Sequence, residues 1–384
     1  MGRLLFVCIF SLLCQVAPGI NVRVGLLTGH NTTEITFIPA GDYVLFSGDK
    51  KIRLIKTGDA LQLKLENGSI ACYAVSGKKE KYRKIKLVSL DSEGFFRLKS
   101  IRPAMPALPY QGHLEVVVTK LSLELINVLE LERYVAAVVE SETGDNLNGE
   151  FLKVQAVIAR TYALANPQRH KEEGFQLCDQ VHCQAYHCRN RFNPEVAAAV
   201  EATRNMVLTD SNLRILKSAY HSNCGGETMS AKDAWGMTDQ SLVSIVDSFC
   251  SGGQHALWTA VIPVHEWKDY LEKKKFVVDS LTTDSVYDFS QVHRLLKYRF
   301  GGNEISLRTI RDDWKFRSSW FSITQKNDTL YFSGRGFGHG VGLCQEGAMC
   351  MAESGYSFME ILSDYFHGIR LTDGNIVEYL KPGN

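Results

Sequence analysis

The chain has 384 residues, of which 45% are hydrophobic and 22% are charged, and its formal net charge is +1 at pH 7. This composition is typical of a globular protein with a substantial core, and the length favours two domains over one. The near-zero net charge argues against a nucleic-acid-binding footprint and against a polybasic membrane patch.

The N-terminus has the pattern of an export signal. Arg3 is followed by an apolar run over residues 4–13 and by the small residues of Ala17-Pro18-Gly19. A basic start, a short apolar core and small residues before the cut predict a signal peptide over residues 1–19, with a short core helix as the alternative. Cys14 could carry a lipid, but the leucine before it is larger than such a site prefers. We therefore expect export to the periplasm or cell envelope without a lipid anchor.

The next segment predicts a β-rich domain over residues 20–112. Apolar residues alternate with polar or small ones in several short runs separated by Gly-Asp and Asn-Gly turn signals, namely 21–26, 43–46 and 61–65. Pro103, Pro106 and Pro109 indicate a join, after which residues 113–129 continue in β style. We expect an α+β protein with this β-rich N-terminal part and a mixed α/β catalytic part over residues 113–384.

The first strong helix pattern begins near Leu129. Its apolar face repeats with helical spacing from Leu131 to Val139, and one further turn of that face reaches Glu142. A carboxylic acid at the end of an apolar stripe is partly desolvated, which is the condition for a general acid at neutral pH. Glu142 is therefore a candidate catalytic acid, although helix ends also carry glutamates with no special role.

A second helix is predicted over residues 150–164, with Asn146 or Asn148 as its N-cap. Gln155 and Arg160 are polar positions on a face that otherwise looks like core. They are either ordinary solvent-facing residues or part of a binding site.

Cysteine and histidine then gather within a short segment. His170, Cys178 and Cys183 form a candidate zinc site, with His182, His187 and Cys188 interspersed. The spacing is not that of a standard zinc finger. A disulfide between two of the three cysteines, or free buried thiols, are the alternatives.

Glycines alternate with other residues from Gly334 to Gly342, and the run leads into a helix-like stretch. Because each glycine costs extra conformational entropy on folding, this density indicates backbone that must approach something closely. The spacing fits neither a dinucleotide loop nor a P-loop. Farther on, Ser357 and Glu360 predict a capping box that begins the last clear helix.

Several blocks of this sequence together resemble the stage II sporulation protein D family, also called the amidase-enhancer family. The blocks occur in family order across about residues 114–371, and they are Leu131–Glu142, Leu152–Leu164, Cys183–Tyr186, Ala219–Thr228, the glycine run, and Met351-Ala352 with Gly355–Leu362. Where the family usually has Met-Pro after the catalytic glutamate, this chain has Thr143-Gly144, and Ser141 replaces an alanine.

The resemblance implies a lytic transglycosylase that cuts peptidoglycan glycan strands, typically those without stem peptides, between N-acetylmuramic acid and N-acetylglucosamine. Glu142 would act as acid and then as base while the muramyl C6 hydroxyl forms a 1,6-anhydro end, and Tyr220 would position the sugar or stabilise its developing charge. Some relatives use a histidine and two cysteines as metal ligands, so a zinc ion here would hold a loop beside the site. The residues expected to line the cleft are Gln155, Arg160, Ser222, Gly225, Gly226, Arg335, Gly336, Gly338, His339, Gly340 and Gln345.

Two other functions remain open at this stage. The chain could be a non-catalytic peptidoglycan-binding protein that stimulates an N-acetylmuramoyl-L-alanine amidase. It could also use Cys224 or Cys344 as a nucleophile beside His221 or His339. Cell-wall remodelling, division and sporulation are all compatible processes.

Overall fold

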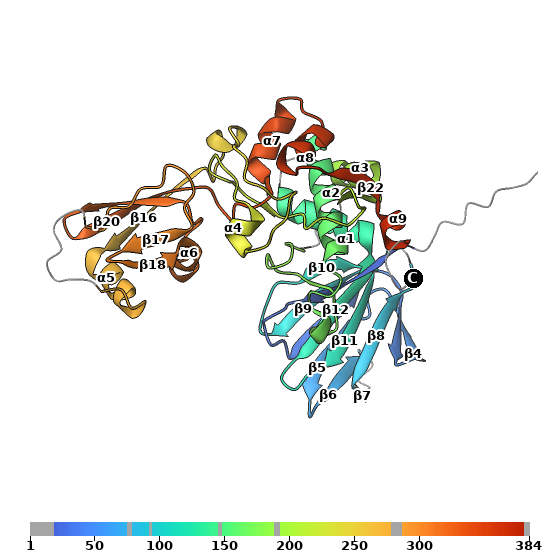
Figure 1. Ribbon diagram of the computed structural model, residues 1–384. Helices are drawn as coiled ribbons and strands as arrows, with labels where there is room; N and C mark the ends of the chain where they lie inside the picture. The colour runs from blue at the N-terminus through green and yellow to red at the C-terminus, as the bar shows by residue number, and fades with distance from the viewer. Residues whose placement is uncertain are drawn as a thin grey trace, which may run out of the picture.

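A computed structural model describes residues 19–74, 79–91, 94–144, 148–187, 193–277 and 286–379. The predicted export signal, apart from Gly19, lies outside these residues, as does Cys188. Figure 1 shows a β-rich N-terminal part, a helical part above it that includes the C-terminal helices, and a separate unit, coloured yellow to orange, to one side of both.

Two sheets make up the β-rich part. The first has the order β13-β1-β12-β11-β8-β3-β4, with β13 at Leu177–Cys178, β1 at Asn21–Leu26, β12 at Leu123–Glu130, β11 at His113–Val118, β8 at Lys84–Ser89, β3 at Tyr43–Ser47 and β4 at Lys50–Ile55. The second has the order β10-β9-β2-β5-β6-β7, with β10 at Leu108–Gln111, β9 at Phe95–Arg102, β2 at Glu34–Pro39, β5 at Leu61–Glu66, β6 at Ser69–Ala74 and β7 at Lys79–Tyr82.

The first sheet crosses the join expected before residue 113. Strand β11 pairs with β8, and β12 pairs with β1 over the full length of the N-terminal strand, from Asn21↔Glu130 to Leu26↔Leu125. Residues on both sides of the join therefore share one sheet, and the division into domains at this point stays a prediction.

Helix α1, at Leu131–Thr143, follows β12 directly, with Glu130 as its N-cap residue. Its apolar face, including Val135, Val138 and Val139, is buried in the core that the sheets share. Helix α2, at Gly149–Ala165, packs against α1 and begins with the Asn148 side chain accepting hydrogen bonds from two backbone N–H groups. The predicted cap at Asn148 is confirmed. A third helix, α3 at Pro194–Ala202, packs on both.

The second face of α2 contributes to a separate core with the C-terminal helices. These are α7 at Gln345–Glu353 and α8 at Phe358–Tyr365, and the predicted capping box of Ser357 and Glu360 is present at the start of α8. Short strand pairs connect distant segments here: β14 at Met206–Thr209 with β22 at Arg370–Asp373, and β15 at Tyr220–His221 with β21 at Leu343–Cys344. Helix α4 lies at Ala231–Trp235, the 3-10 turns η1 and η2 at Lys171–Glu173 and Phe249–Gly252, and α9 at Gly374–Tyr379.

The separate unit is formed by the elements from β16 to β20, and the last two residues of β20 begin the glycine run. It has a three-stranded sheet, a hairpin and two helices around an aromatic core: β16 at Leu257–Pro263, α5 at Val264–Lys273, β17 at Lys297–Phe300, β18 at Asn303–Ser306, α6 at Leu307–Trp314, β19 at Phe321–Lys326 and β20 at Thr329–Arg335. Figure 1 shows it projecting away from the β-rich part.

These elements confirm the α+β class with a β-rich N-terminal part. Within the described residues, none of the helices is both long enough and apolar enough to span a membrane.

Candidate functional site

Glu142 lies on the last turn of α1, where its carboxylate is held from two sides. Its Oε1 accepts a hydrogen bond from the Tyr220 hydroxyl at 2.9 Å and another from the backbone N–H of Ala185, also at 2.9 Å. Its Oε2 has no hydrogen-bond partner among the described residues, and the residue is partly exposed. The structure thus brings together the two residues predicted as catalytic, from segments 78 positions apart.

Two further residues extend this arrangement into the core. The Gln184 side chain donates to the Tyr220 hydroxyl at 3.4 Å and accepts from the Tyr134 hydroxyl at 3.0 Å. Burial raises the pKa of both tyrosines, so each hydroxyl stays protonated and can donate. Sequence reasoning assigned Gln184 and Tyr134 no role, although Gln184 lies in a family block and Tyr134 on the apolar face of α1.

The loop after Cys183 is fixed to α1 by Ser141. The Ser141 hydroxyl accepts a hydrogen bond from His187 N–H at 2.9 Å, and its single proton faces the carbonyl oxygens of Ala137 at 2.7 Å and His187 at 3.0 Å. This serine, which replaces a family alanine, therefore holds the segment carrying Ala185 against the end of the helix. Helix α1 itself ends at Gly144, whose φ is +59°.

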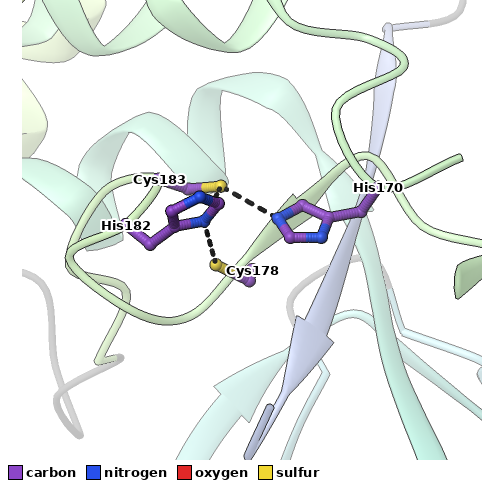
Figure 2. Close-up of side chains that lie close together, drawn as sticks. All are labelled: His170, Cys178, His182 and Cys183. Carbon is purple, nitrogen blue, oxygen red and sulfur yellow. Dashed lines mark hydrogen bonds between the residues drawn. The ribbon is translucent and has the colours of Figure 1, made fainter. Parts of the chain in front are cut away.

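The predicted metal ligands converge beside this loop. The ligand atoms of His170, Cys178 and Cys183 lie within 4.8 Å of one another, together with those of His182. Figure 2 shows the four side chains turned toward one another. Cys183 Sγ is 3.4 Å from His170 Nε2, and Cys178 Sγ is 3.8 Å from His182 Nδ1. The fourth residue, His182, was noted in the sequence but not predicted as a ligand.

The surroundings of these four residues also suit a metal. Glu173 lies 3.1 Å from His170 Nδ1, and a carboxylate on the outer ring nitrogen orients the inner one toward a metal. Cys178 is fixed by β13, which pairs in parallel with β1 at the sheet edge. The hydrogen bond between the two sulfurs lowers the pKa of Cys178 and raises that of Cys183, so one thiolate forms readily. Two soft sulfurs and two imidazoles form a donor set that tetrahedral zinc prefers.

The glycine run approaches the protein's own backbone. A Cβ on Gly338 would lie 2.7 Å from His221 Cβ, and one on Gly342 would lie 2.2 Å from the Ala219 carbonyl oxygen. Both glycines also have positive φ, at +114° and +71°. The close partner that the glycine density predicted is therefore the segment from Ala219 to Gly225.

Gly336, Gly338 and Gly340 were expected to line the cleft, but many N–H groups of the run are bonded within the protein. Gly336 N–H donates to the Ala256 carbonyl and Gly338 N–H to that of Arg317. Gly336 and Gly338 thus have no free N–H for a ligand. The Gly340 carbonyl accepts from Met229 N–H, and an added Cβ at Gly340 would meet the Arg294 guanidinium.

The two polar side chains of the run lie in different surroundings. The His339 ring lies 5.5 Å from that of His221, and burial lowers the pKa of His339 to about 4. Arg335 is exposed at the end of β20, with its guanidinium 5.3 Å from the Trp320 ring. Only His339 therefore adjoins the strand that carries Tyr220.

Of the residues predicted in the 219–228 block, Ser222 is partly exposed and its carbonyl accepts from Glu346 N–H. Gly225 contacts Arg335, whereas Gly226 faces open space. Of these three residues, Gly225 contacts the glycine run, and Ser222 contacts the start of α7.

Three of the predicted lining residues with polar side chains are buried. Arg160 is 0% exposed, and its guanidinium makes a two-point ion pair with Glu132 on α1, with Nε 2.8 Å from Oε1 and Nη2 2.5 Å from Oε2. Gln155 is 2% exposed, and its Nε2 has no hydrogen-bond partner within the part of the chain that the structure describes. The same holds for Nε2 of Gln345, at the start of α7, which is 7% exposed. Arg160 joins α1 to α2 and has no exposed surface for a ligand.

A cavity of about 230 Å³ lies between α4 and α6, on the other side of His339. It is lined by residues including Met229, Trp235 and Arg311, and neither Glu142 nor Tyr220 borders it. Since the hydrogen bonds converge on Glu142, we place the candidate site there.

The cysteine-nucleophile alternative finds little geometric basis. Cys224 and Cys344 are 0% exposed, and within the described residues no hydrogen bond joins either sulfur to His221 or His339. Burial raises the pKa of Cys344, which opposes formation of the thiolate nucleophile.

Comparisons with known proteins converge on one family. The profile of the family described as SpoIID, stage II sporulation protein, matches residues 119–209, which include α1, α2 and the Cys183 loop. Stage II sporulation protein D of Bacillus amyloliquefaciens is 26% identical over 293 residues, covering 72% of this chain and 84% of that protein. An uncharacterized protein of Brachyspira hyodysenteriae is 27% identical over 274 residues, covering 70% and 74%. The amidase enhancer of Bacillus subtilis is 25% identical over 289 residues, covering 61% of this chain and 40% of that protein.

Proposed function

This chain belongs to the stage II sporulation protein D and amidase-enhancer family, and from that premise we propose that it is a lytic transglycosylase of peptidoglycan. The names of its relatives support a role in the cell wall or in sporulation. The proposed substrate is the glycan strand, and the bond cut is that between N-acetylmuramic acid and N-acetylglucosamine in strands without stem peptides.

The observation that carries this proposal is the way Glu142 is held. Oε1 already accepts two hydrogen bonds, from Tyr220 and from Ala185, so the exchangeable proton belongs on the unpartnered Oε2. A carboxyl group with one fixed oxygen and one accessible oxygen can give up a proton and take one back at the same position.

In the proposed reaction Glu142 Oε2–H protonates the glycosidic oxygen as the bond from that oxygen to C1 of the muramyl sugar breaks. The C6 hydroxyl oxygen of the same sugar then bonds to C1, and its proton passes to Glu142. The products are a 1,6-anhydromuramyl end and a free 4-hydroxyl on the leaving sugar, and no water is consumed. Because the nucleophile is intramolecular, proximity reduces what the protein must supply.

Tyr220 is a positioning residue in this scheme. Its hydroxyl donates to Oε1 and is itself held by Gln184, so the carboxylate keeps one orientation through both proton transfers. Among the predicted lining residues, His339 adjoins the strand of Tyr220 and the partly exposed Ser222 follows that strand, and in this proposal both would contact the sugar.

Zinc at His170, Cys178, His182 and Cys183 is part of the proposal. The donor set fits the ion, and Glu173 supplies the outer hydrogen bond that ligating histidines usually have. Bound there, zinc would supply structural cross-linking. Cys183 is followed directly by Gln184 and Ala185, so fixing it fixes the two contacts that reach Tyr220 and Glu142. Metal analysis of the wild type and of Cys183→Ser tests this, and equal zinc content in both would contradict it.

Export is also proposed, since the glycan strands lie outside the cytoplasmic membrane. A second candidate function is stimulation of an N-acetylmuramoyl-L-alanine amidase without catalysis, which is favoured by the relative named amidase enhancer.

One experiment separates these functions. Purified peptide-free glycan strands are incubated with wild type or with Glu142→Gln, and the products are identified by mass spectrometry. We expect anhydromuramyl ends from the wild type alone. Reducing ends would indicate hydrolysis with a second carboxylate, and binding without cleavage by either protein would favour the amidase-stimulating function.

A further inference from the structure

A second cluster of potential ligands is buried away from the first. Cys224 follows β15, Asp247 and Cys250 flank the start of η2, and Cys344 ends β21 and caps α7. One atom from each of the four side chains lies within 4.8 Å of the others, and all four residues are at most 2% exposed. Cys224 Sγ lies 3.3 Å from Cys250 Sγ and 3.2 Å from Asp247 Oδ2.

The charges of this cluster are unusual for a protein core. A buried carboxylate needs a cation or several donors. Asp247 accepts hydrogen bonds from the Tyr365 hydroxyl and from Phe249 N–H, each at 2.9 Å, and a third from the Cys224 thiol at 3.2 Å when that thiol is protonated. The neighbouring guanidinium, that of Arg294, donates instead to the carbonyls of Cys224 and Glu227. A cation among the sulfurs would complete the pairing.

The sulfurs are also arranged as thiolate ligands would be. Cys344 Sγ accepts the N–H groups of Cys224 and Gly347, at 3.2 and 3.4 Å, and lies at the N-terminus of α7. Both features stabilise negative charge on sulfur. In a tetrahedral zinc site with Zn–S bonds of about 2.3 Å, the sulfurs are about 3.8 Å apart, so Cys224 and Cys250, at 3.3 Å, would need to separate by about 0.5 Å.

A disulfide explains the cluster less well. A bond between Cys224 and Cys250 would use two of the sulfurs and leave Cys344 and Asp247 without a role. It would also require the two sulfurs to approach by more than 1 Å, from 3.3 Å to about 2.05 Å.

We propose that Cys224, Cys250, Cys344 and Asp247 form a second, structural zinc site. Three thiolates and one carboxylate oxygen are a donor set that zinc takes in tetrahedral geometry, and soft sulfur ligands select it over magnesium or calcium. All four positions are filled by protein and the cluster is buried, so the site has no open position for substrate. Binding releases thiol protons, and Arg294 and the start of α7 offset the remaining negative charge.

The site joins three distant segments. Strand β15 pairs in parallel with β21 through Tyr220↔Leu343 and His221↔Cys344. Both Cys344, the last residue of β21, and Cys224, three residues after β15, lie at the C-terminal end of this parallel pair, so a metal bound by them would fix the two strands to each other there. It would thereby hold the strand that carries Tyr220, whether or not the protein cuts glycan.

The test uses the full chain with Cys178→Ser and Cys183→Ser, which removes the first donor set. Cobalt(II) is titrated into the reduced, metal-free protein, and zinc is then added to displace it. We expect one cobalt ion per chain, with the intense visible absorption of a tetrahedral site and sulfur-to-cobalt charge transfer. Zinc K-edge absorption should then fit three sulfurs at about 2.3 Å and one oxygen at about 2.0–2.2 Å.

Variants in the same background locate the ion. Asp247→Asn keeps the side-chain shape and should weaken cobalt binding at least tenfold, while Cys250→Ser should abolish the charge-transfer band. Cys72→Ser removes a thiol that is equally buried but lies in β6, and should leave binding unchanged. Absence of cobalt binding in the folded parent would overturn the proposal. So would a Cys224–Cys250 disulfide found by peptide mapping of the wild-type chain.

Discussion

Tyr220→Phe tests how the candidate site holds its acid. The substitution removes one hydroxyl, and with it the 2.9 Å hydrogen bond to Glu142 Oε1 and the 3.4 Å bond from Gln184. The Ala185 N–H bond to Oε1 remains, so the carboxylate loses one of two anchors. A hydrogen bond to a charged group contributes about 1.5–3 kcal/mol. If that contribution is fully expressed in the transition state, kcat/KM should fall about 10- to 150-fold.

The assay is the release of anhydromuramyl ends from peptide-free glycan, with thermal unfolding to verify that the variant is folded. Tyr73→Phe is the matched control, because it removes a tyrosine hydroxyl that bonds the Glu66 carboxylate at 2.6 Å in β6 and β5, outside the candidate site. The control should keep wild-type activity. A folded Tyr220→Phe protein that cleaves at the wild-type rate would refute the positioning role.

Three further predictions concern stability. Arg160→Met and Glu132→Leu should each lower the free energy of unfolding by about 3–5 kcal/mol, because each single variant leaves a buried charge unpaired. The double variant should lose less free energy of unfolding than the sum of the two single losses. Denaturant unfolding of the three variants measures these differences. His339 has a folded-state pKa of about 4, below its ordinary value of 6.5, so the unfolded chain binds its proton first and stability should fall as the pH drops from about 6.5 to about 4. That fall, followed by urea unfolding at several pH values, should be smaller in His339→Gln. Gly342→Ala should lower the free energy of unfolding, measured with urea, more than Gly29→Ala does. Both glycines have positive φ, which costs an alanine about 1–3 kcal/mol of backbone strain. Of the two, Gly342 also has a carbonyl oxygen 2.2 Å from the added Cβ.

Local patterns in the sequence predicted the elements that depend on local interactions. The apolar repeat from Leu131 placed Glu142 at the end of a helix, and Asn148 and Ser357 were recognised as caps because their side chains bond N–H groups two or three residues away. Alternation located β1, β3 and β5 for the same reason, since strand faces repeat every two residues.

Partners distant in sequence could not be predicted in this way. The glycine run showed that something lies close to its backbone, but not that the neighbour is the segment from Ala219 to Gly225, more than 100 positions earlier. The sequence pattern left Arg160 as either a solvent-facing residue or part of a binding site, and the family resemblance implied a place in the cleft. Its partner, Glu132, lies 28 positions away on another helix and accounts for it as an ion pair. Cys224 and Cys344 lie 120 positions apart, so local sequence patterns could not predict that their sulfurs meet in one cluster.

The hydrogen bond between Tyr220 and Glu142 joins two parts of the site that are held independently. The Glu142 side depends on the loop of Cys183, which carries Ala185 and lies among the ligands of the proposed first zinc site. The Tyr220 side depends on the β15–β21 pair, and the second cysteine cluster lies at the C-terminal end of that pair. Neither cluster needs to contact substrate to affect the reaction, because a shift of either part would separate the hydroxyl from the carboxylate. Loss of either proposed metal should therefore lower activity in the same way as Tyr220→Phe, by weakening the hydrogen bond to Glu142. When the metal-ligand variant is combined with Tyr220→Phe, the fold-loss of activity should be smaller than the product of the two separate fold-losses.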